Sequence, residues 1–240
     1  MPFEQMDMQQ VASYLHLDAR EVRKLASRGR MPCRKRKDGF VFRKIEIDHW
    51  IETQLHELPS RRLAQIEVGV RRHHGMDEDD LLVHQMIPEG GIAVPLRSRT
   101  RASVLRDLVA MADACGVVYA ADELHRAIVD REQVHSTALT RDVALPHPRE
   151  HTPYDIAASF IVAGRSPCGL PFGAPDGSLT RLFFLICCKD DRTHLHVLTR
   201  LSRMLRRQDT ITALLEAADD QEFRDELKAS EWLALSVPIA

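Results

Sequence analysis

Short apolar runs alternate with longer amphipathic segments throughout the chain after Leu81. The apolar runs are typical of buried strands, and the amphipathic segments are typical of helices. Strands are predicted at Gly91–Pro95, Val143–Leu145, Ile156–Ala163 and Leu182–Cys188, and helices at Arg101–Cys115, Ala121–Gln133, Thr193–Arg206, Asp209–Glu216 and Gln221–Ser230. Because strands and helices interleave, we expect an α/β sheet covered by helices.

The composition allows a sizeable core but no membrane span. The 240 residues are 44% hydrophobic and 28% charged, which is typical of one or two globular domains. No apolar run approaches the roughly 20 residues of a membrane helix, and the opening MPFEQMDMQQ lacks the apolar core of a signal peptide. The five cysteines show no zinc-finger spacing. We therefore expect a cytoplasmic protein with reduced thiols.

Charge is unevenly distributed along the chain. The formal net charge of −2 argues against nucleic-acid binding by the chain as a whole. Between Arg20 and Lys44, however, eleven basic residues face two acidic ones, a local charge of about +9. Residues 59–80 lack a regular apolar pattern apart from a short predicted helix over Arg61–Val70. We predict one domain over residues 1–58, a linker over 59–80 and a second domain over 81–240.

The N-terminal domain is predicted to contain three short helices and a hairpin. The segment MDMQQVASYLHL forms the first helix, Asp18 caps the second, and Gly29 ends it. The segment CRKRKDGFVFR is typical of a hairpin with an Asp38–Gly39 turn, and Ile45–Leu58 of a third amphipathic helix. This order of elements indicates a helix-turn-helix with a wing.

The exposed cations of this domain are candidate contacts to double-stranded DNA. The helix from Asp18 to Arg28 can lie in a major groove, and the wing can neutralise neighbouring phosphates. The candidates are Arg20, Arg23, Lys24 and Arg28 on the helix, and Arg34, Lys35, Arg36 and Lys37 on the wing. The alternative is a basic surface that binds protein rather than DNA.

A pattern of mostly core residues in the same segment resembles the excisionase and MerR-like DNA-binding domains. Those domains carry A-x-x-L at the end of the first helix, V-x-x-L in the recognition helix, G-x-(I/L/M)-P before the wing and D-x-(D)-x-W in the last helix. Their places are held here by Ala12, Leu15, Val22, Leu25, Gly29, Met31, Pro32, Asp48 and Trp50.

One histidine of the larger domain directly follows a predicted strand. In RDVALPHPRE, the apolar run Val143–Leu145 leads into His147, which stands between two prolines. The prolines end the strand and stiffen the backbone around the histidine. A rigidly held neutral imidazole can accept a phosphoryl group on one nitrogen while a hydrogen bond fixes the other. Arg131 and Arg149 are the local cations that could balance the charge of the transferring group.

Two motifs in this domain occur in the same order in a known family. The segment ELHRAIVDREQVHSTALTRDVALPHPR follows the pattern L…A…RE…ST…G.AIPH.R, and FGAPDGSLTRLFFLICCKDDRTHLHVLTRLSRML follows F.A.DG.PV.L.F.L..P…HL..L..L…L. On these motifs, Leu81–Leu233 resembles the IIA domain of the fructose/mannitol type of the bacterial phosphoenolpyruvate-dependent sugar phosphotransferase system, in particular its nitrogen-regulatory branch.

The resemblance implies an α/β (α+β) fold with a mixed β-sheet flanked by helices, and no metal or organic cofactor. It implies that His147 accepts a phosphoryl group from an HPr-like histidine phosphocarrier protein, and that His194 is a second active-site histidine close to it. Arg131 would stabilise the phosphohistidine. Arg149 also occupies a motif position and completes the candidate site.

The loop before His147 departs from the family pattern. The family commonly carries glycines between its ST and IPH motifs, whereas Ser136–Asp142 contains none. Glycine allows left-handed backbone conformations and close approach of a partner. We therefore expect a stiffer or reshaped loop here, and this departure bears on the rate of phosphotransfer and on the identity of the donor.

Three functions fit the two domains. The leading hypothesis is a regulatory phosphocarrier or transcription regulator, in which phosphorylation of His147 alters DNA binding. The second is a sugar-transport IIA component that passes phosphate to a separate IIB/IIC permease. The third is a non-catalytic interaction domain. Helix-turn-helix proteins often bind DNA as dimers, so a homodimer is left open.

Overall fold

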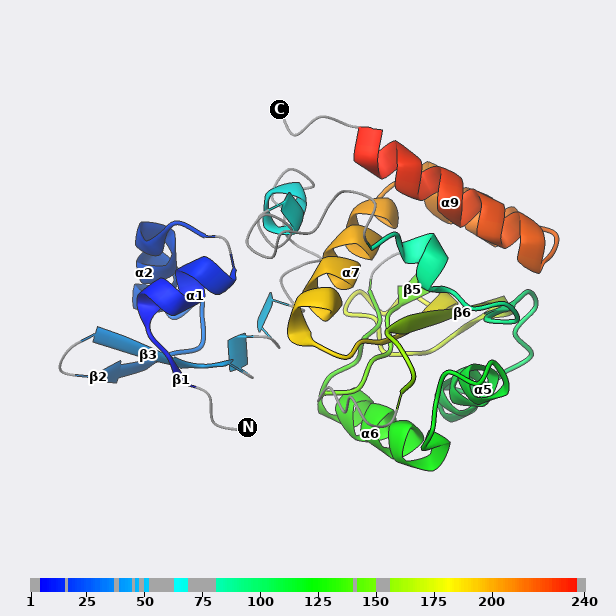
Figure 1. Ribbon diagram of the computed structural model, residues 1–240, viewed down its shortest axis with the longest axis horizontal. Coiled ribbons are helices and arrows are strands. Elements are labelled where there is room, and N and C mark those ends of the chain that lie inside the picture. Colours follow the sequence, from blue (N-terminus) through cyan, green and yellow to red (C-terminus); the bar gives the residue numbers. More distant parts are fainter. Residues whose placement is uncertain are drawn as a thin grey trace. The chain divides into compact units, whose positions relative to one another are not determined.

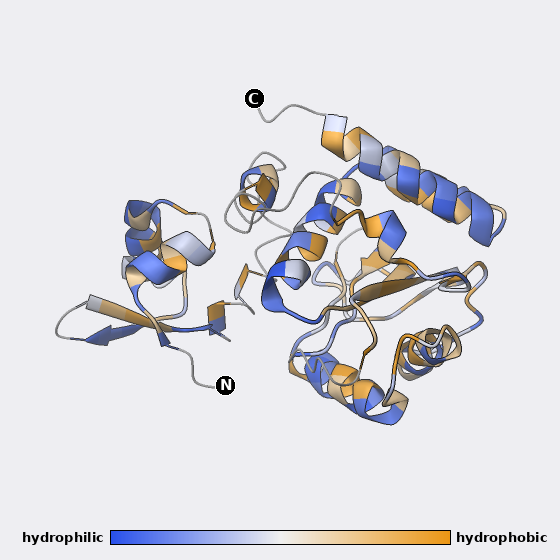
Figure 2. Cartoon of the chain, in the orientation of Figure 1, coloured by the Kyte–Doolittle hydropathy of each residue, from blue (hydrophilic) through white to orange (hydrophobic). Residues whose placement is uncertain are grey.

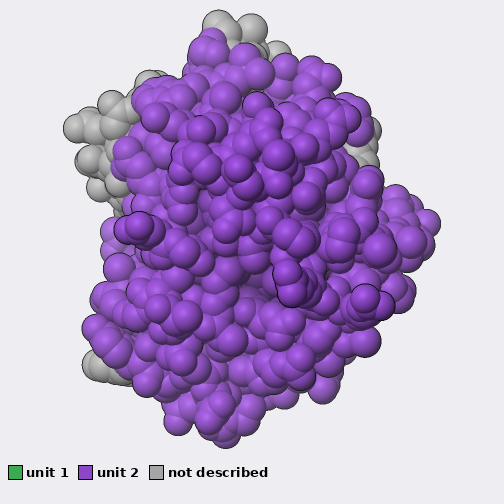
Figure 3. Space-filling model, turned by 90° about the vertical axis from the view of Figure 1, so that its right-hand side faces the viewer, with its two compact units in different colours: residues 1–77, 239–240 green, residues 78–238 purple. Residues whose placement is uncertain are grey.

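The chain forms two compact units, residues 1–77 with 239–240 and residues 78–238. The computed structural model describes residues 5–15, 17–36, 39–44, 46–47, 50–51, 63–68, 81–139, 142–149 and 156–236. Each unit has its own helices and strands (Figure 1). The described residues of the second unit form one closely packed body in the space-filling view of Figure 3.

The first unit is a helix-turn-helix with a small sheet. Strand β1 (Gln5–Met6) comes first in the chain. Helices α1 (Met8–Tyr14) and α2 (Ala19–Ser27) follow, and then strands β2 (Arg34–Arg36) and β3 (Gly39–Arg43). Strand β3 is central and pairs antiparallel with both β1 and β2. The core is formed by apolar side chains of both helices, β3 and the segments beside them: Met6, Val11, Ala12, Leu15, Val22, Ala26, Met31, Phe42, Ile47 and Ile51.

Local sequence signals determine where α2 begins and ends. The Asp18 side chain accepts a hydrogen bond from the Arg20 amide at 2.7 Å, as an N-cap does. Gly29 follows the last turn in the left-handed conformation, with φ +68°. Both features were predicted. Trp50 donates its indole N–H to the Arg30 carbonyl at 2.7 Å, which fixes the described part of the third helix against the end of α2.

Two boundaries in this unit differ from the prediction. Helix α1 starts at Met8 rather than Met6, because Asp7 is its N-cap and Met6 pairs within the sheet. The hairpin register pairs Arg36 with Gly39, so this glycine belongs to β3 rather than to the turn. Of the predicted helix Ile45–Leu58, residues 45, 48–49 and 52–58 lie outside the described residues.

The second unit is built on a mixed four-stranded sheet, as expected. Its strands are β4 (Ile92–Ala93), β5 (Asp142–Ala144), β6 (Phe160–Leu170) and β7 (Thr180–Cys187). Their order is β4-β6-β7-β5. The central pair, β6 and β7, is antiparallel, and each outer strand is parallel to its neighbour.

Helices cover both faces of this sheet. They are α5 (Arg101–Ala114), α6 (Ala121–Val134), α7 (Asp191–Met204), α8 (Gln208–Glu216) and α9 (Asp220–Ser236), with a short 3₁₀ helix, η1 (Val83–Met86), before β4. Figure 1 shows α5 and α6 on one side of the strands and α7 and α9 on the other. Because both faces are covered, the central strands read as continuous apolar runs rather than as an alternation.

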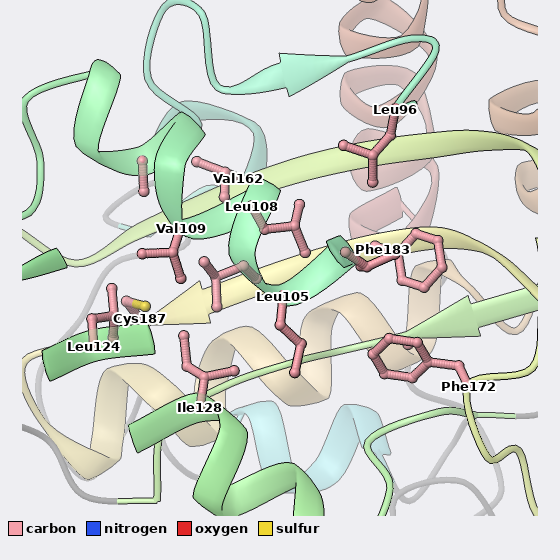
Figure 4. Close-up of a cluster of buried hydrophobic side chains, with 14 of the residues drawn as sticks. Leu96, Leu105, Leu108, Val109, Leu124, Ile128, Val162, Phe172, Phe183 and Cys187 are labelled. Atoms are coloured by element: carbon pink, nitrogen blue, oxygen red, sulfur yellow. The ribbon is translucent and has the colours of Figure 1, made fainter. Parts of the chain in front are cut away.

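Alternate residues of β7 serve the two layers. Phe183 belongs to the cluster that α5 and α6 form on one face, together with Leu108 and Ile128 (Figure 4). Phe184 points to the other face and packs against Phe223 of α9, with ring centroids 6.1 Å apart. This alternation is the two-residue period of a strand.

A strand and a short helix of this unit differ from the prediction. Strand β6 starts at Phe160 rather than Ile156 and continues to Leu170, beyond the predicted end at Ala163. A register irregularity between Arg165 and Leu170 accommodates the proline and glycine of this stretch. The helix η1 was not predicted.

In the first unit, residues 63–68 are helical within the predicted Arg61–Val70. Among the described residues, no helix combines the length and apolar character that crossing a bilayer requires.

A buried ion pair joins the elements of the α7–α9 layer. Arg200 of α7 and Glu231 of α9 are both fully buried, with Nη1 and Oε1 2.8 Å apart. The same carboxylate accepts hydrogen bonds from the Val83 amide at 2.8 Å and from the His84 amide at 3.0 Å. Glu231 therefore holds α7, α9 and η1 together.

We predict that Glu231→Ala lowers the free energy of unfolding by about 3–5 kcal/mol, because it removes the carboxylate that balances a buried guanidinium. Urea denaturation of the full chain measures this change. Lys228→Ala, at an exposed position of the same helix, is the control and is expected to change stability by less than about 0.5 kcal/mol. Equal denaturation midpoints for the two variants would contradict the assignment.

Candidate phosphohistidine site

His147 lies three residues after the end of β5 and is buried, with 3% of its surface exposed. The backbone before it is tied to the sheet, since the Ile186 amide of β7 donates to the Pro146 carbonyl at 2.9 Å. The strand end, the flanking prolines and this hydrogen bond together hold the imidazole in one place.

A hydrogen bond determines which nitrogen of His147 carries the proton. Nδ1 lies 2.7 Å from the Leu145 carbonyl oxygen. A carbonyl oxygen can only accept, so Nδ1 must be the donor. In the neutral ring, Nε2 then carries the lone pair and is the nucleophilic nitrogen.

His194 lies beside His147, as the family resemblance implied. Their ring centroids are 4.9 Å apart and the rings are inclined by 59°. His194 sits in the first turn of α7 and is 8% exposed. The N-cap Asp190 positions this turn, because its carboxylate accepts from the amides of Arg192 and Thr193, each at 3.0 Å. Among the described residues, no three His, Cys, Asp or Glu side chains gather as a metal site requires.

The two predicted arginines occupy different environments. Arg131 lies in the last turn of α6 and is 5% exposed, and its guanidinium donates to the His135 carbonyl at 2.9 Å. Arg149 is exposed, two residues after His147. The structure thus brings the two histidines into ring contact, and it places one arginine in the interior and the other on the surface.

Sequence reasoning did not assign a role to Glu132, the neighbour of Arg131. Its side chain is 2% exposed, and its carboxylate is 2.7 Å from the Arg101 guanidinium of α5. Ser136 and Thr137, four and five residues later, fold back onto the same carboxylate. Hydroxyl residues four and five positions after a glutamate at a helix end are a local signal for this contact. The partner Arg101 lies on another helix and leaves no such signal.

The loop without glycines still contains a left-handed residue. Asp142, the last residue before the apolar run of β5, has φ +68°. Its carboxylate forms a two-point ion pair with Arg181, at 2.8 and 3.0 Å. The hydrogen bond to Asp142 raises the pKa of Arg181.

A glycine is required at position 173, which packs against the start of this loop. Gly173 has φ +101°, and a Cβ there would lie 3.0 Å from the Ser136 side chain.

The candidate DNA contacts of the first unit are exposed wherever the structure describes them. On α2 and just beyond its end these are Arg20, Arg23, Lys24 and Arg28, and on β2 they are Arg34, Lys35 and Arg36. Figure 2 shows β2 as uniformly hydrophilic. Lys37 lies outside the described residues.

Two family models match the chain. The model described as "Phosphoenolpyruvate-dependent sugar phosphotransferase system, EIIA 2" matches residues 85–230. The model described as "Helix-turn-helix domain" matches residues 6–55.

Proteins named as components of phosphotransferase systems are similar to this chain. The fructose-specific EIIABC component of Bacillus subtilis is 28% identical over 145 residues, 60% of this chain and 22% of that protein. This chain therefore spans about a fifth of that relative's length. The fructose-specific EIIA component of Haloferax volcanii is 28% identical over 130 residues, 53% of this chain and 82% of that protein.

Two solved structures share the fold of the second unit. The nitrogen regulatory protein IIA-Ntr of Neisseria meningitidis has a TM-score of 0.55 and 20% identity, covering 60% of this chain and 98% of that one. The IIA mannitol structure of Escherichia coli has a TM-score of 0.52 and 23% identity, covering 58% and 96%. Since the first family model matches more than half of the residues, the chain belongs to the EIIA 2 family of the phosphoenolpyruvate-dependent sugar phosphotransferase system, with a helix-turn-helix domain at its N-terminus.

Proposed function

We propose that this chain is a regulatory phosphocarrier, which accepts a phosphoryl group on His147 from an HPr-like histidine phosphocarrier and thereby changes the DNA binding of its helix-turn-helix domain. The observation that carries the proposal is the 2.7 Å hydrogen bond from Nδ1 of His147 to Leu145, with the His194 ring 4.9 Å away. A regulator of this kind would act in the cytoplasm.

The transfer step follows from the tautomer of His147. The lone pair of Nε2 attacks the phosphorus of the donor's phosphohistidine, and a new N–P bond forms. The donor's N–P bond breaks, and its electron pair returns to the donor ring. Nδ1 keeps its proton throughout, so the step needs no base. The phosphorylated ring becomes positive, which strengthens the Nδ1–H hydrogen bond to the Leu145 carbonyl.

Phosphorylation of His147 would introduce negative charge that neighbouring groups must balance. The phosphoryl group carries nearly two negative charges at neutral pH. We assign Arg131 and Arg149 to this task because cations spread the charge of a transferring phosphoryl group, and His194 because its ring lies 4.9 Å from that of His147. The position of His194 in the first turn of α7 is favourable too, since a helix N-terminus attracts anions.

Incubation with phosphoenolpyruvate, enzyme I and an HPr-type carrier is expected to add one phosphoryl group to the wild-type chain and none to His147→Ala, because that variant lacks the accepting nitrogen. Intact mass spectrometry measures the transfer. His125→Ala, at a partly buried histidine of α6 that the candidate site does not include, is the control and should be labelled like wild type. Label on His147→Ala would place the acceptor elsewhere.

The DNA-binding part of the proposal rests on the exposed cations of α2 and β2. A helix with basic outer residues next to a basic strand presents positive charge to a groove and to the phosphates beside it. Each neutralised phosphate releases counterions, so the affinity should fall steeply with salt.

Replacing both Arg23 and Lys24 by alanine is expected to flatten the dependence of log K on log salt by about 0.9 for each lost phosphate contact. Fluorescence anisotropy with duplex DNA at several salt concentrations gives this slope. The paired variant Arg106→Ala and Arg126→Ala removes two exposed arginines of the second unit and should leave the slope unchanged. Equal slopes for the two double variants would refute the contact assignment.

Helix α7 connects the histidine pair to the start of the second unit. It carries His194 in its first turn, and two residues later the buried His196 donates its Nε2–H to the Leu81 carbonyl at 3.1 Å. Leu81 follows closely after Glu78, where the second unit begins. A displacement of the first turn of α7 on phosphorylation would therefore shift Leu81 and the chain that precedes it.

Phosphorylation of wild type is expected to change DNA affinity by about fivefold or more, the usual size of an allosteric coupling. His196→Leu removes the donor to Leu81 and should reduce this change below about twofold without preventing phosphorylation. His196→Gln keeps a donor and serves as the conservative control. A full affinity change in His196→Leu would show that coupling does not run through this hydrogen bond.

Two other functions have observations in their favour. A sugar-transport component that passes phosphate to a separate IIB/IIC permease is favoured by relatives named as fructose-specific components. A transport component has no need of a helix-turn-helix domain, however, and this favours the regulator. A non-catalytic interaction domain is favoured by the glycine-free loop with its left-handed Asp142. Phosphoryl acceptance by His147 separates this last function from the other two.

A further inference from the structure

Glu132 is the centre of a buried polar cluster next to the histidine pair. Its Oε2 accepts from the Thr137 hydroxyl at 2.6 Å, and both of its oxygens accept from the Thr137 amide, at 3.0 and 3.1 Å. Oε1 also lies 2.9 Å from the Ser136 hydroxyl and 2.7 Å from the Arg101 guanidinium. A buried carboxylate with this many donors is strongly fixed in place.

The cluster continues to His147 through two backbone groups. The Thr137 carbonyl accepts from the Leu145 amide at 3.1 Å. The Leu145 carbonyl accepts from Nδ1 of His147 at 2.7 Å. The amide that is held by Thr137 and the carbonyl that sets the tautomer thus belong to the same residue.

The segment after Glu132 also lines the free side of β5. The Leu139 amide donates to the Val143 carbonyl at 2.7 Å, and Ala138 forms an antiparallel bridge with Ala144. Strand β7 holds the other side of β5. The position of the Leu145 carbonyl therefore depends on the Ser136–Leu139 segment, and this segment is anchored by Glu132.

We propose that Glu132 is a positioning residue, which acts through Thr137 and Leu145 to hold His147 in the tautomer with a proton on Nδ1. Its effect on phosphotransfer rests on the proposed function, but its effect on the tautomer does not. Arg101 balances the charge of the buried carboxylate from α5. A neutral imidazole in the other tautomer would carry its proton on Nε2 and could not attack phosphorus with that nitrogen.

The tautomer can be measured directly on the full chain. Long-range ¹H–¹⁵N spectra of histidine-labelled protein, recorded where the imidazole is neutral, distinguish a protonated Nδ1 from a protonated Nε2. The His147 signals are those missing from His147→Ala. The test variants are Thr137→Val, which removes the 2.6 Å hydroxyl contact at equal size, and Glu132→Gln. Thr137→Ser keeps the hydroxyl, and Ile211→Val weakens the core beneath α8 without touching the cluster.

Wild type, Thr137→Ser and Ile211→Val are expected to show the Nδ1–H tautomer of His147. Thr137→Val and Glu132→Gln should show a mixture, and phosphorylation by the carrier should then fall about tenfold in kcat with KM nearly unchanged. A dominant Nε2–H tautomer in wild type, or an unchanged tautomer in both test variants, would overturn the inference. If the tautomer shifts as expected but wild type accepts no phosphate, the positioning role stands and the proposed function fails.

Discussion

The hydrogen bond from Nδ1 of His147 to the Leu145 carbonyl determines which nitrogen of His147 is available to a phosphoryl group. It leaves Nε2 as the basic nitrogen, and it supplies an acceptor for the proton of the positive ring that phosphorylation would create. This hydrogen bond depends on the backbone that holds the Leu145 carbonyl in position. That backbone is held by β7 on one side and by the Ser136–Leu139 segment on the other. The mixed sheet is therefore the support of the site as well as the core of the unit.

Periodicity and capping residues predicted most of the fold. Helix α5 begins at Arg101 as expected, and α8 ends at Glu216 as expected, because their apolar patterns are local. Strand β6 was predicted to end at Ala163 but continues to Leu170 through Pro167 and Gly169, two residues that usually weaken a strand. The observed irregularity in the β6–β7 pairing places these residues without ending the strand. The partner strand β7 was predicted, but the sequence does not show how β6 and β7 pair, and this pairing accommodates the two residues.

The candidate site was predictable to a similar degree. His147 stood out because prolines flank it at a strand end, and His194 came from the family motif. Glu132 was missed as a centre because its partner Arg101 is 31 residues away in the sequence, on another helix. Such a contact leaves no local pattern. The ion pair between Asp142 and Arg181, 39 residues apart, was missed for the same reason.

That ion pair explains how the loop before His147 manages without glycine. A left-handed conformation costs a non-glycine residue about 1 kcal/mol, although aspartate tolerates it better than most residues. Asp142 adopts this conformation with φ +68°, and the two-point contact with Arg181 offsets part of the cost. The loop thus differs from the family in composition but keeps a left-handed turn into β5.

³¹P–¹⁵N correlation spectroscopy of the phosphorylated, histidine-labelled chain tests most directly which nitrogen atom accepts the phosphoryl group. We predict that the phosphorus is coupled to Nε2 of His147 while Nδ1 keeps its proton. Phosphorus coupled to Nδ1 of His147, or to any other histidine, would contradict it.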